Sequence, residues 1–157
     1  MTTRGKGGRQ ALLICRVGSR LCGIPLEHVR ETMRPLPVEP LGRAPAFVDG
    51  LSLIRGRPTP VIDAPRLLGA ATTQKARGRY VTLRVGERCA ALAVDAVLGV
   101  RQVDLAELDE LPVLLREHNE LVAALGALDH ELFLVLERAR LVPESVWAAL
   151  DAREQAP

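Results

Sequence analysis

A five-residue pattern occurs twice in this chain, and it constrains the fold more than any other feature. The first copy is Arg16–Arg20 (Arg-Val-Gly-Ser-Arg), and the second, 68 residues later, is Arg84–Arg88 (Arg-Val-Gly-Glu-Arg). Apolar stretches such as Ala11–Val17 and Tyr80–Val85 flank the two copies. Each copy therefore predicts a tight turn between two antiparallel strands.

The similarity continues beyond the two turns. At the same offset Ile24 matches Leu92, and Glu27 matches Asp95. We interpret this as a duplicated β unit, with chance similarity between two hairpins as the alternative. The polar stretch 69–79 falls between the copies and is expected to connect them. If each β unit forms a small β-barrel, each barrel would be only marginally stable alone. We therefore expect the two barrels to share a core where they meet.

The remaining pattern is mainly β. Further strands are expected at Leu21–Ile24, Leu51–Ile54, Pro60–Ile62, Cys89–Val94, Val97–Val103, Leu121–Leu128 and Glu131–Leu136. Pro58 and Pro60 lack a backbone N–H, which predicts an edge or irregular position for the strand that holds them. Leu26–Met33 is predicted to form one or two helical turns. A helix that starts at Pro143-Glu144 closes the chain, and Trp147 is expected to anchor it in the core.

Composition limits the size and class of the protein. The chain has 157 residues, of which 48% are hydrophobic and 3% aromatic. This length allows one ordinary domain or two very small ones, and the composition excludes a wholly disordered chain. The expected organisation is a flexible basic leader at 1–10, a folded part at 11–150 and a flexible tail at 151–157.

No segment has the pattern of a secretory signal or a membrane anchor. The longest uncharged apolar stretch, Leu121–Leu128, is far shorter than the about 20 residues that a spanning helix needs. We therefore expect a soluble cytoplasmic protein without direct membrane insertion. Cys15, Cys22 and Cys89 lack CxxC spacing, which favours buried reduced thiols over a disulfide or a metal site.

Charge is distributed unevenly along the chain. The formal net charge is +2, but segment 101–137 carries two arginines against nine carboxylates, and segment 66–88 carries six bases against one acid. Such patches steer encounters with partners. A β-barrel that binds nucleic acid or a small ligand is the alternative function. It would need aromatic residues among the bases, and 66–88 contains only Tyr80, so we expect no nucleic-acid partner.

Motifs for catalysis are missing from the sequence. It contains no P-loop, dinucleotide fingerprint, zinc-ligand spacing or nucleophile elbow. Asp63 and Asp95 each stand alone in their β unit, so we expect them to accept backbone N–H bonds rather than to act in acid–base catalysis. We predict no catalytic residue, no metal and no cofactor.

Several motifs together resemble the CheW-like coupling proteins of bacterial chemotaxis. They are Gly23-Ile24, Val29-Arg30-Glu31, Ala44–Gly56, Pro60–Asp63, Val94–Val97 and Leu125–Leu128. The resemblance covers essentially all of Ala11–Leu150, and the order of motifs across Pro45–Asp63 is its most specific part. It implies two packed SH3-like five-stranded β-barrels with short helices and a C-terminal helix, which agrees with the internal repeat.

The resemblance also implies a function and a binding surface. The protein would be a non-catalytic adaptor between the regulatory domain of the chemotaxis histidine kinase and the cytoplasmic tip of methyl-accepting chemoreceptors. Its partner-binding residues would be Val29, Glu31, Gly50, Arg55 and Gly56, with Arg55 paired to Glu31. The residues alone leave purely structural roles open: Arg55 as the holder of a turn, Val29 as a core residue and Gly50 as a turn glycine.

Overall fold

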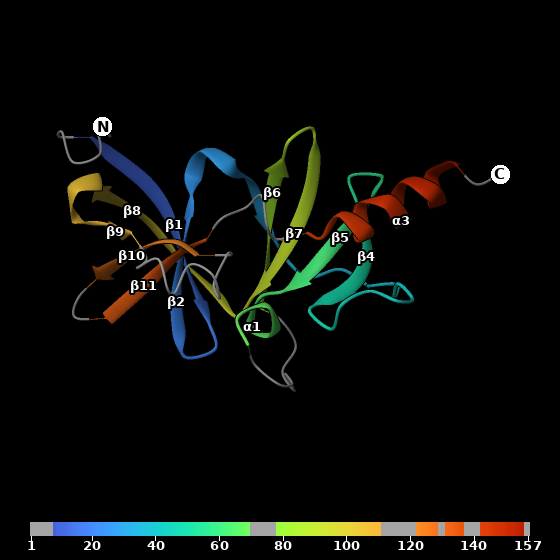
Figure 1. The fold of residues 1–157 in the computed structure, drawn as a ribbon, viewed down its shortest axis with the longest axis horizontal. Coiled ribbons are helices and arrows are strands. Elements are labelled where there is room, and N and C mark those ends of the chain that lie inside the picture. Colours follow the sequence, from blue (N-terminus) through green and yellow to red (C-terminus); the bar gives the residue numbers. More distant parts are fainter. Residues whose placement is uncertain (1–7, 70–77, 111–121, 129–130, 137–141, 156–157) are drawn as a thin grey trace.

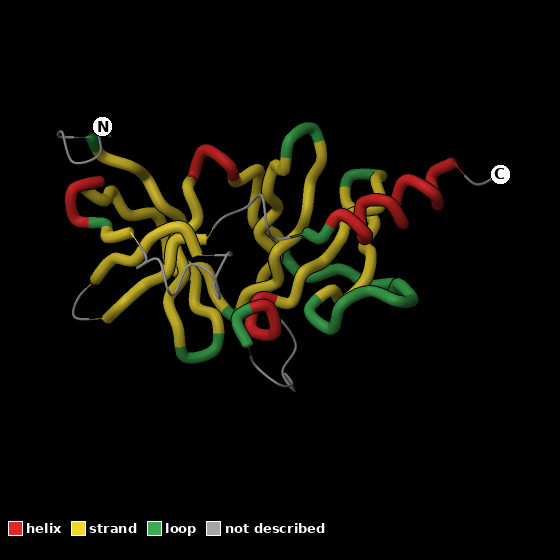
Figure 2. Tube along the Cα trace, viewed as in Figure 1, coloured by secondary structure: helices red, strands yellow, loops and turns green. Residues whose placement is uncertain are grey.

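The computed structural model describes residues 8–69, 78–110, 122–128, 131–136 and 142–155. Most of these residues are strand, and they form two sheets that lie side by side (Figures 1 and 2). In spatial order, sheet A consists of β8 (Ala96–Asp104), β1 (Arg9–Val17), β2 (Arg20–Pro25), β11 (Glu131–Leu136), β10 (Val122–Leu128) and β9 (Asp109–Glu110). Sheet B consists of β3 (Val29–Met33), β6 (Arg79–Val85), β7 (Arg88–Val94), β5 (Arg57–Asp63) and β4 (Val48–Ile54).

In the described part of the chain, the helices are few and mostly short. They are the 3-10 turns η1 (Leu26–His28) and η2 (Leu105–Glu107), the one-turn α1 (Ala64–Leu67) and the C-terminal α3 (Glu144–Gln155). This architecture confirms the predicted mainly-β fold of two small barrels. The two-residue strand β9 is the one addition to five strands per sheet.

Each sheet contains strands from both copies of the repeat. The β1–β2 hairpin lies in sheet A, but the next strand, β3, crosses to sheet B and pairs with β6. In return, β8 follows the β6–β7 hairpin and crosses to sheet A, where it pairs with β1. The orders β8-β1-β2-β11-β10 and β3-β6-β7-β5-β4 are therefore equivalent, with β11 parallel to β2 and β5 parallel to β7. This symmetry supports the duplication.

Because of this crossing, the segment 69–79 does not connect the elements that we expected it to connect. We expected it to separate two consecutive barrels, but β5 before it and β6 after it belong to the same sheet. The barrels are joined instead by the exchange of β3 and β8. At the two ends of the folded part, β1 begins at Arg9 and α3 continues to Gln155.

Both faces of the two central hairpins are buried. Along β1, Leu12 and Ile14 pack inside sheet A, while Leu13, Cys15 and Val17 face a core shared with sheet B. On β7, Ala91 and Ala93 pack inside sheet B, while Ala90, Leu92 and Val94 face the shared core. Side chains alternate between the faces of a strand, so a strand buried on both sides is apolar at consecutive positions, as Leu12–Cys15 and Ala90–Val94 are. The expected shared core is present.

The two repeated turns have the same conformation. Gly18 and Gly86 have φ values of 60° and 65°, and each follows the last residue of its first strand. A positive φ costs glycine nothing, which explains the glycine in both copies. Asp95 accepts a hydrogen bond from the Gly18 N–H, and Asp63 caps α1 by accepting from the Arg66 N–H, as expected for both carboxylates.

Two local predictions hold only in part. Leu26–Met33 is not helical beyond the three residues of η1, because Val29–Met33 pairs with β6 as strand β3. Strand β5 is not an edge strand, since it lies between β4 and β7. However, its pairing with β7 begins only at Val61, beyond Pro58 and Pro60, so neither proline N–H is needed on that side.

The thiols and the last helix largely follow expectation. Cys15 and Cys22 are fully buried opposite each other on β1 and β2, and burial raises the pKa of both thiols to about 12. Cys89 is only partly buried. Trp147 on α3 packs into the shared core as predicted.

Among the described residues, no helix is long and apolar enough to cross a membrane, and no three His, Cys, Asp or Glu side chains gather as a metal site would require.

Candidate functional site

The tightest feature of the predicted surface is the turn between β4 and β5. Ile54 pairs with Arg57, so Arg55 and Gly56 alone form the connection. Their φ values are 53° and 77°, which is the pattern of a type I′ hairpin turn. Asn, Asp or Gly is the usual first residue of such a turn, and an arginine there is strained. The backbone of Arg55 is therefore held by something beyond its own preference.

Glu31 on β3 supplies that restraint. Arg55 donates to both carboxylate oxygens of Glu31, from Nε at 2.9 Å and from Nη2 at 2.8 Å. Two parallel bonds of this kind fix the plane of the guanidinium group as well as its position. The Arg55 side chain is nevertheless 76% exposed, and that of Glu31 is 30% exposed.

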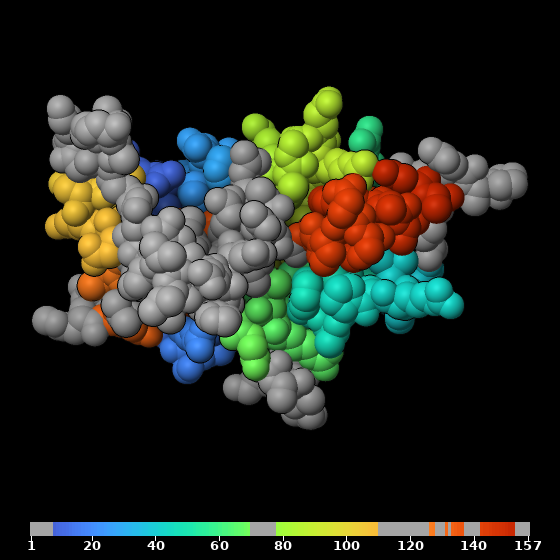
Figure 3. All heavy atoms as spheres, in the orientation of Figure 1, coloured from blue at the N-terminus to red at the C-terminus, as the bar shows by residue number. Residues whose placement is uncertain are grey.

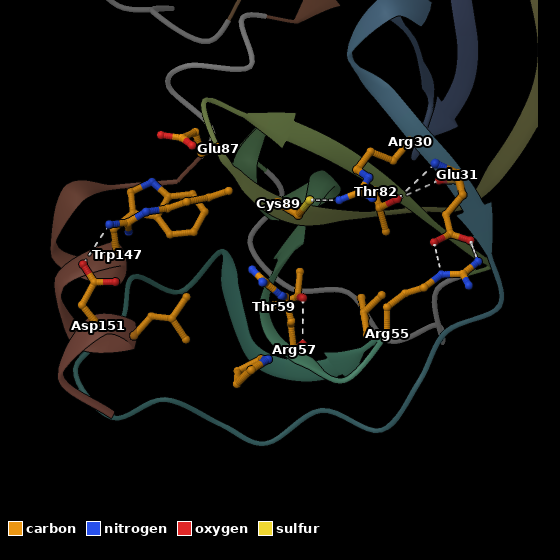
Figure 4. A pocket seen from close by; sticks show the side chains of 14 residues that line it. Arg30, Glu31, Arg55, Arg57, Thr59, Thr82, Glu87, Cys89, Trp147 and Asp151 are labelled. Carbon is orange, nitrogen blue, oxygen red and sulfur yellow. Dashed lines mark hydrogen bonds and ion pairs between the residues drawn. The ribbon is translucent and has the colours of Figure 1, made fainter. Parts of the chain in front are cut away.

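Glu31 is itself fixed by β6. Its backbone N–H donates to Thr82 Oγ1 at 3.1 Å, and the Thr82 hydroxyl lies 3.2 Å from the Glu31 carbonyl oxygen, to which it donates. Thr82 is buried, and the contact falls where the register of β3 against β6 shifts. The side chain of Glu31 thus projects from an anchored bulge toward Arg55 (Figure 4).

The pair alters the titration of both groups. Hydrogen bonds from Arg55 lower the pKa of Glu31, and the positive charges of Arg55 and Arg30 act in the same direction. The bond to Glu31 raises the pKa of Arg55 in turn. Both groups are therefore charged at neutral pH. The result is a rigid and exposed ion pair that can contact a partner.

A groove begins beside this ion pair and extends to α3. It has a volume of about 540 Å³, and its lining comes from strands β3–β7, the β4–β5 and β6–β7 turns, and α3. Trp147, Leu150 and Asp151 form the α3 side. In Figure 3, α3 (red) covers the surface next to the β6–β7 hairpin (yellow-green). Four arginines line the groove, namely Arg30, Arg55, Arg57 and Arg88.

A second concave surface lies at the edge of sheet B. Leu53 is 66% exposed on β4, and a groove of about 410 Å³ runs past it between Pro37, Val38 and Pro58. Leu98 and Val100 on β8 are also exposed.

The family model of the CheW-like domain matches residues 11–146. The chain belongs to the CheW-like family. Protein FrzA of Myxococcus xanthus is 33% identical to this CheW-like chain over 100 residues, which are 63% of the chain and 62% of that protein. Chemotaxis protein CheW of Rhizobium meliloti (strain 1021) is 32% identical over 107 residues, 68% of either chain. The chain thus spans about two thirds of the length of these relatives.

A solved structure gives the same answer for the fold. The scaffolding protein TtCheW from Thermoanaerobacter tengcongensis matches this CheW-like chain with a TM-score of 0.75 at 21% identity. The match covers 83% of this chain and 90% of that one. The resemblance seen in the sequence is confirmed at the level of family and fold.

The structure brings together three of the five residues predicted for partner binding in this CheW-like chain. Glu31, Arg55 and Gly56 form one cluster. Val29 lies at the start of β3, opposite Leu83, and packs against the shared core while staying partly exposed.

Gly50 has a structural reason of its own. It sits in β4 with a φ of 141°, and a Cβ atom there would overlap the carbonyl oxygen of Glu39. Glu39 forms an isolated bridge with Leu51, the next residue, through hydrogen bonds of 2.7 and 2.8 Å. Gly50 therefore allows the loop before β4 to close onto the strand.

Sequence reasoning missed the rest of the groove. Arg30, Arg57 and Arg88 are far apart in the sequence. They reach one surface only because β3, β5 and β7 belong to the same sheet. The single signal was the short spacing between Arg55 and Arg57. Because Arg55 is in the two-residue turn and Arg57 is the first residue after it, the two arginines stay close together.

Proposed function

We propose that this chain is a non-catalytic adaptor that couples chemoreceptors to a histidine kinase in a chemosensory pathway. Membership of the CheW-like family supports the proposal, as do the names of the similar proteins, a chemotaxis protein and a scaffolding protein. The observation that carries it is the Glu31–Arg55 pair. It is an exposed charged feature that the fold holds in one orientation, at two hydrogen bonds of 2.8 and 2.9 Å.

The proposed partners are the regulatory domain of the kinase and the cytoplasmic tip of methyl-accepting chemoreceptors. The residues proposed for partner binding are Val29, Glu31, Gly50, Arg55 and Gly56. Glu31 and Arg55 would contact a partner directly, and Gly56 would permit the turn that presents Arg55. Gly50 would act indirectly by holding the loop before β4 in place. The protein would act in the cytoplasm and reach receptor arrays only through these partners.

A nucleic-acid-binding barrel is less well supported. Tyr80, the single aromatic residue among the bases of 66–88, is 2% exposed and donates its hydroxyl to the Leu36 carbonyl oxygen at 3.2 Å. A buried tyrosine cannot stack on a base, and stacking supplies much of the affinity of single-strand binders.

Pull-down assays with each partner test the proposal. We expect the wild-type chain to bind both the kinase regulatory domain and a receptor-tip fragment. Arg55→Ala should weaken binding of at least one of them, and Arg55→Gly should do the same while it relieves the strain of the positive φ. Because Arg55→Gly keeps the turn, a loss of binding without a loss of thermal stability assigns Arg55 to the interface.

Two results would contradict the proposal. Wild-type protein that binds neither fragment, but is retained on nucleic acid at moderate salt, would favour the barrel alternative. Full binding of both fragments by both Arg55 variants would remove Arg55 from the proposed surface.

A further inference from the structure

We propose that the groove between the Glu31–Arg55 pair and α3, called here the arginine groove, binds an acidic segment of a partner protein through Arg30 and Arg57. This inference rests on the proposed adaptor function and adds to it the chemistry of one contact. Arg30 belongs to β3 and Arg57 to β5, and both line the same space of about 540 Å³ (Figure 4). Grooves of this volume are large enough for several side chains of a bound peptide.

Two of the acidic groups of the groove are already paired. Both oxygens of Glu31 accept hydrogen bonds from Arg55, and Asp151 accepts one from Arg88 at 2.8 Å. Each of these pairs supplies one arginine, Arg55 or Arg88, with a carboxylate partner. The third lining carboxylate, Glu87, is at the β6–β7 turn, at the far end of the view from Arg55.

Arg30 and Arg57 form no ion pair within hydrogen-bond distance of a carboxylate among the described residues. Arg30 donates from Nη1 to the sulfur of Cys89 at 3.0 Å, and sulfur is a weak acceptor. The guanidinium group of Arg57 forms no hydrogen bond or ion pair within the described part of the chain. A guanidinium group presents five N–H donors in a plane, a geometry that matches a carboxylate. The groove therefore offers two cationic sites for an anion.

The rest of the lining favours a peptide over a nucleotide. Ile54 and Leu150 contribute apolar surface to the same groove, where they can contact the methylene groups of a glutamate side chain. The Trp147 ring is not free for stacking, because Arg88 lies over it with its Cζ atom 4.9 Å from the ring centre. An aromatic base would have to displace that arginine. We therefore assign the groove to glutamate or aspartate side chains.

Fluorescence anisotropy with the full-length chain tests this assignment. The probe is a labelled glutamate-rich peptide, and its control is the same peptide with glutamine at each glutamate position. We expect binding of the glutamate peptide at low salt, weaker binding as salt is raised, and no binding of the glutamine peptide. The double variant Arg30→Gln/Arg57→Gln should bind about tenfold or more weakly, since two charge-assisted contacts are removed.

Arg79→Gln is the matched control. Arg79 is an exposed arginine on β6 that does not line the groove, so its loss changes the net charge without touching the site. Equal weakening by Arg79→Gln would mean a nonspecific charge effect and would overturn the proposal. Equal binding of the two peptides to the wild-type chain would overturn it without reference to any variant. Binding of millimolar inorganic phosphate to a chain that does not bind the glutamate peptide would also contradict it, since it would identify a phosphate site.

The same double variant separates this inference from the proposed function. If it loses the glutamate peptide but still binds the kinase domain and the receptor tip fully, the acidic-partner inference is wrong and the adaptor function stands. If the wild-type chain binds neither partner, the adaptor function fails whatever the peptide does. Weakened binding of one partner by the double variant, and not by Arg79→Gln, supports the inference.

Discussion

Arg55 occupies a backbone conformation that suits glycine or asparagine better, and its side chain is tied to Glu31. The sequence-based resemblance included this pair, but it could not show how exposed the pair is. A shielded pair would be costly to break from one side, whereas an exposed one is worth little to stability because water solvates both charges. At the scale of single residues, the pair therefore serves orientation more than stability.

The titration of Glu31 tests this pairing directly. We expect its pKa, followed by NMR of the side-chain carboxyl, to lie below the ordinary glutamate value and to rise toward it in Arg55→Ala. A folded-state pKa below the unfolded one stabilises the fold above the unfolded pKa, and this contribution is lost as the pH falls through the folded pKa. Wild type and Arg55→Ala should thus converge in stability at acidic pH.

Arg57→Ala is the control for that titration. Arg57 lines the same groove but does not bond to Glu31, so it should leave the Glu31 pKa nearly unchanged. A Glu31 pKa that is the same in wild type and Arg55→Ala would show that the ion pair does not persist in solution.

Gly50 gives a second residue-scale prediction. Gly50→Ala should lower the free energy of unfolding by roughly 2–4 kcal/mol, because the new Cβ meets the Glu39 carbonyl and the φ of 141° is strained for alanine. Gly42→Ala is the matched control, since no atom lies within 4 Å of a Cβ there and its φ is not positive. Urea unfolding of both variants measures the difference. Equal stability of the two would refute the steric role of Gly50.

Strands and turns were more predictable than the short segment after β2. The two repeated turns were predicted correctly, because a glycine at a fixed place between apolar runs is a local signal. Leu26–Met33 was predicted as helical, and only Leu26–His28 has a helical turn. The alternation of Val29, Glu31 and Met33 is too short to identify a strand, and β3 exists because β6 pairs with it. Nonlocal pairing of this kind leaves no mark in the sequence of β3 itself.

Helix α3 is the element whose side chains connect the shared core to the arginine groove. Trp147 is 6% exposed and packs into that core, while Arg88 covers its ring and bonds to Asp151 one turn further along the helix. We expect Trp147→Ala to reduce the free energy of unfolding by about 3–5 kcal/mol, since a large buried side chain is removed.

Ser145→Ala is the control on the same helix. Ser145 is exposed, so its change should alter stability by well under 1 kcal/mol. Thermal or urea unfolding of both variants makes the comparison. If Trp147→Ala were as stable as Ser145→Ala, α3 would not be packed on the core in solution.

The whole molecule shows where sequence reasoning reached its limit. The internal repeat and the motifs of Pro45–Asp63 predicted the two barrels and the family correctly. They did not predict that β3 and β8 would be exchanged between the sheets, or that 69–79 would connect strands of one sheet. The candidate site shows the same division, because its Glu31–Arg55 centre was predicted while the groove beside it depends on pairing across sheet B.

The exchange also suits the adaptor function that we propose. Each barrel alone would bury few side chains, but the crossing strands and the shared core couple the two into one unit. Surfaces on both barrels, such as the Glu31–Arg55 pair and the exposed Leu98 on β8, are thereby held in a fixed relation. A fixed relation between surfaces is what an adaptor between two partners needs.

Bridging is the most direct test of the central claim. The receptor-tip fragment is immobilised, and retention of the kinase regulatory domain on it is measured with and without the full-length chain. We predict that the kinase domain is retained only when the chain is present, and that Arg55→Ala reduces this retention. Retention that is the same with and without the chain would contradict the claim that this protein is an adaptor.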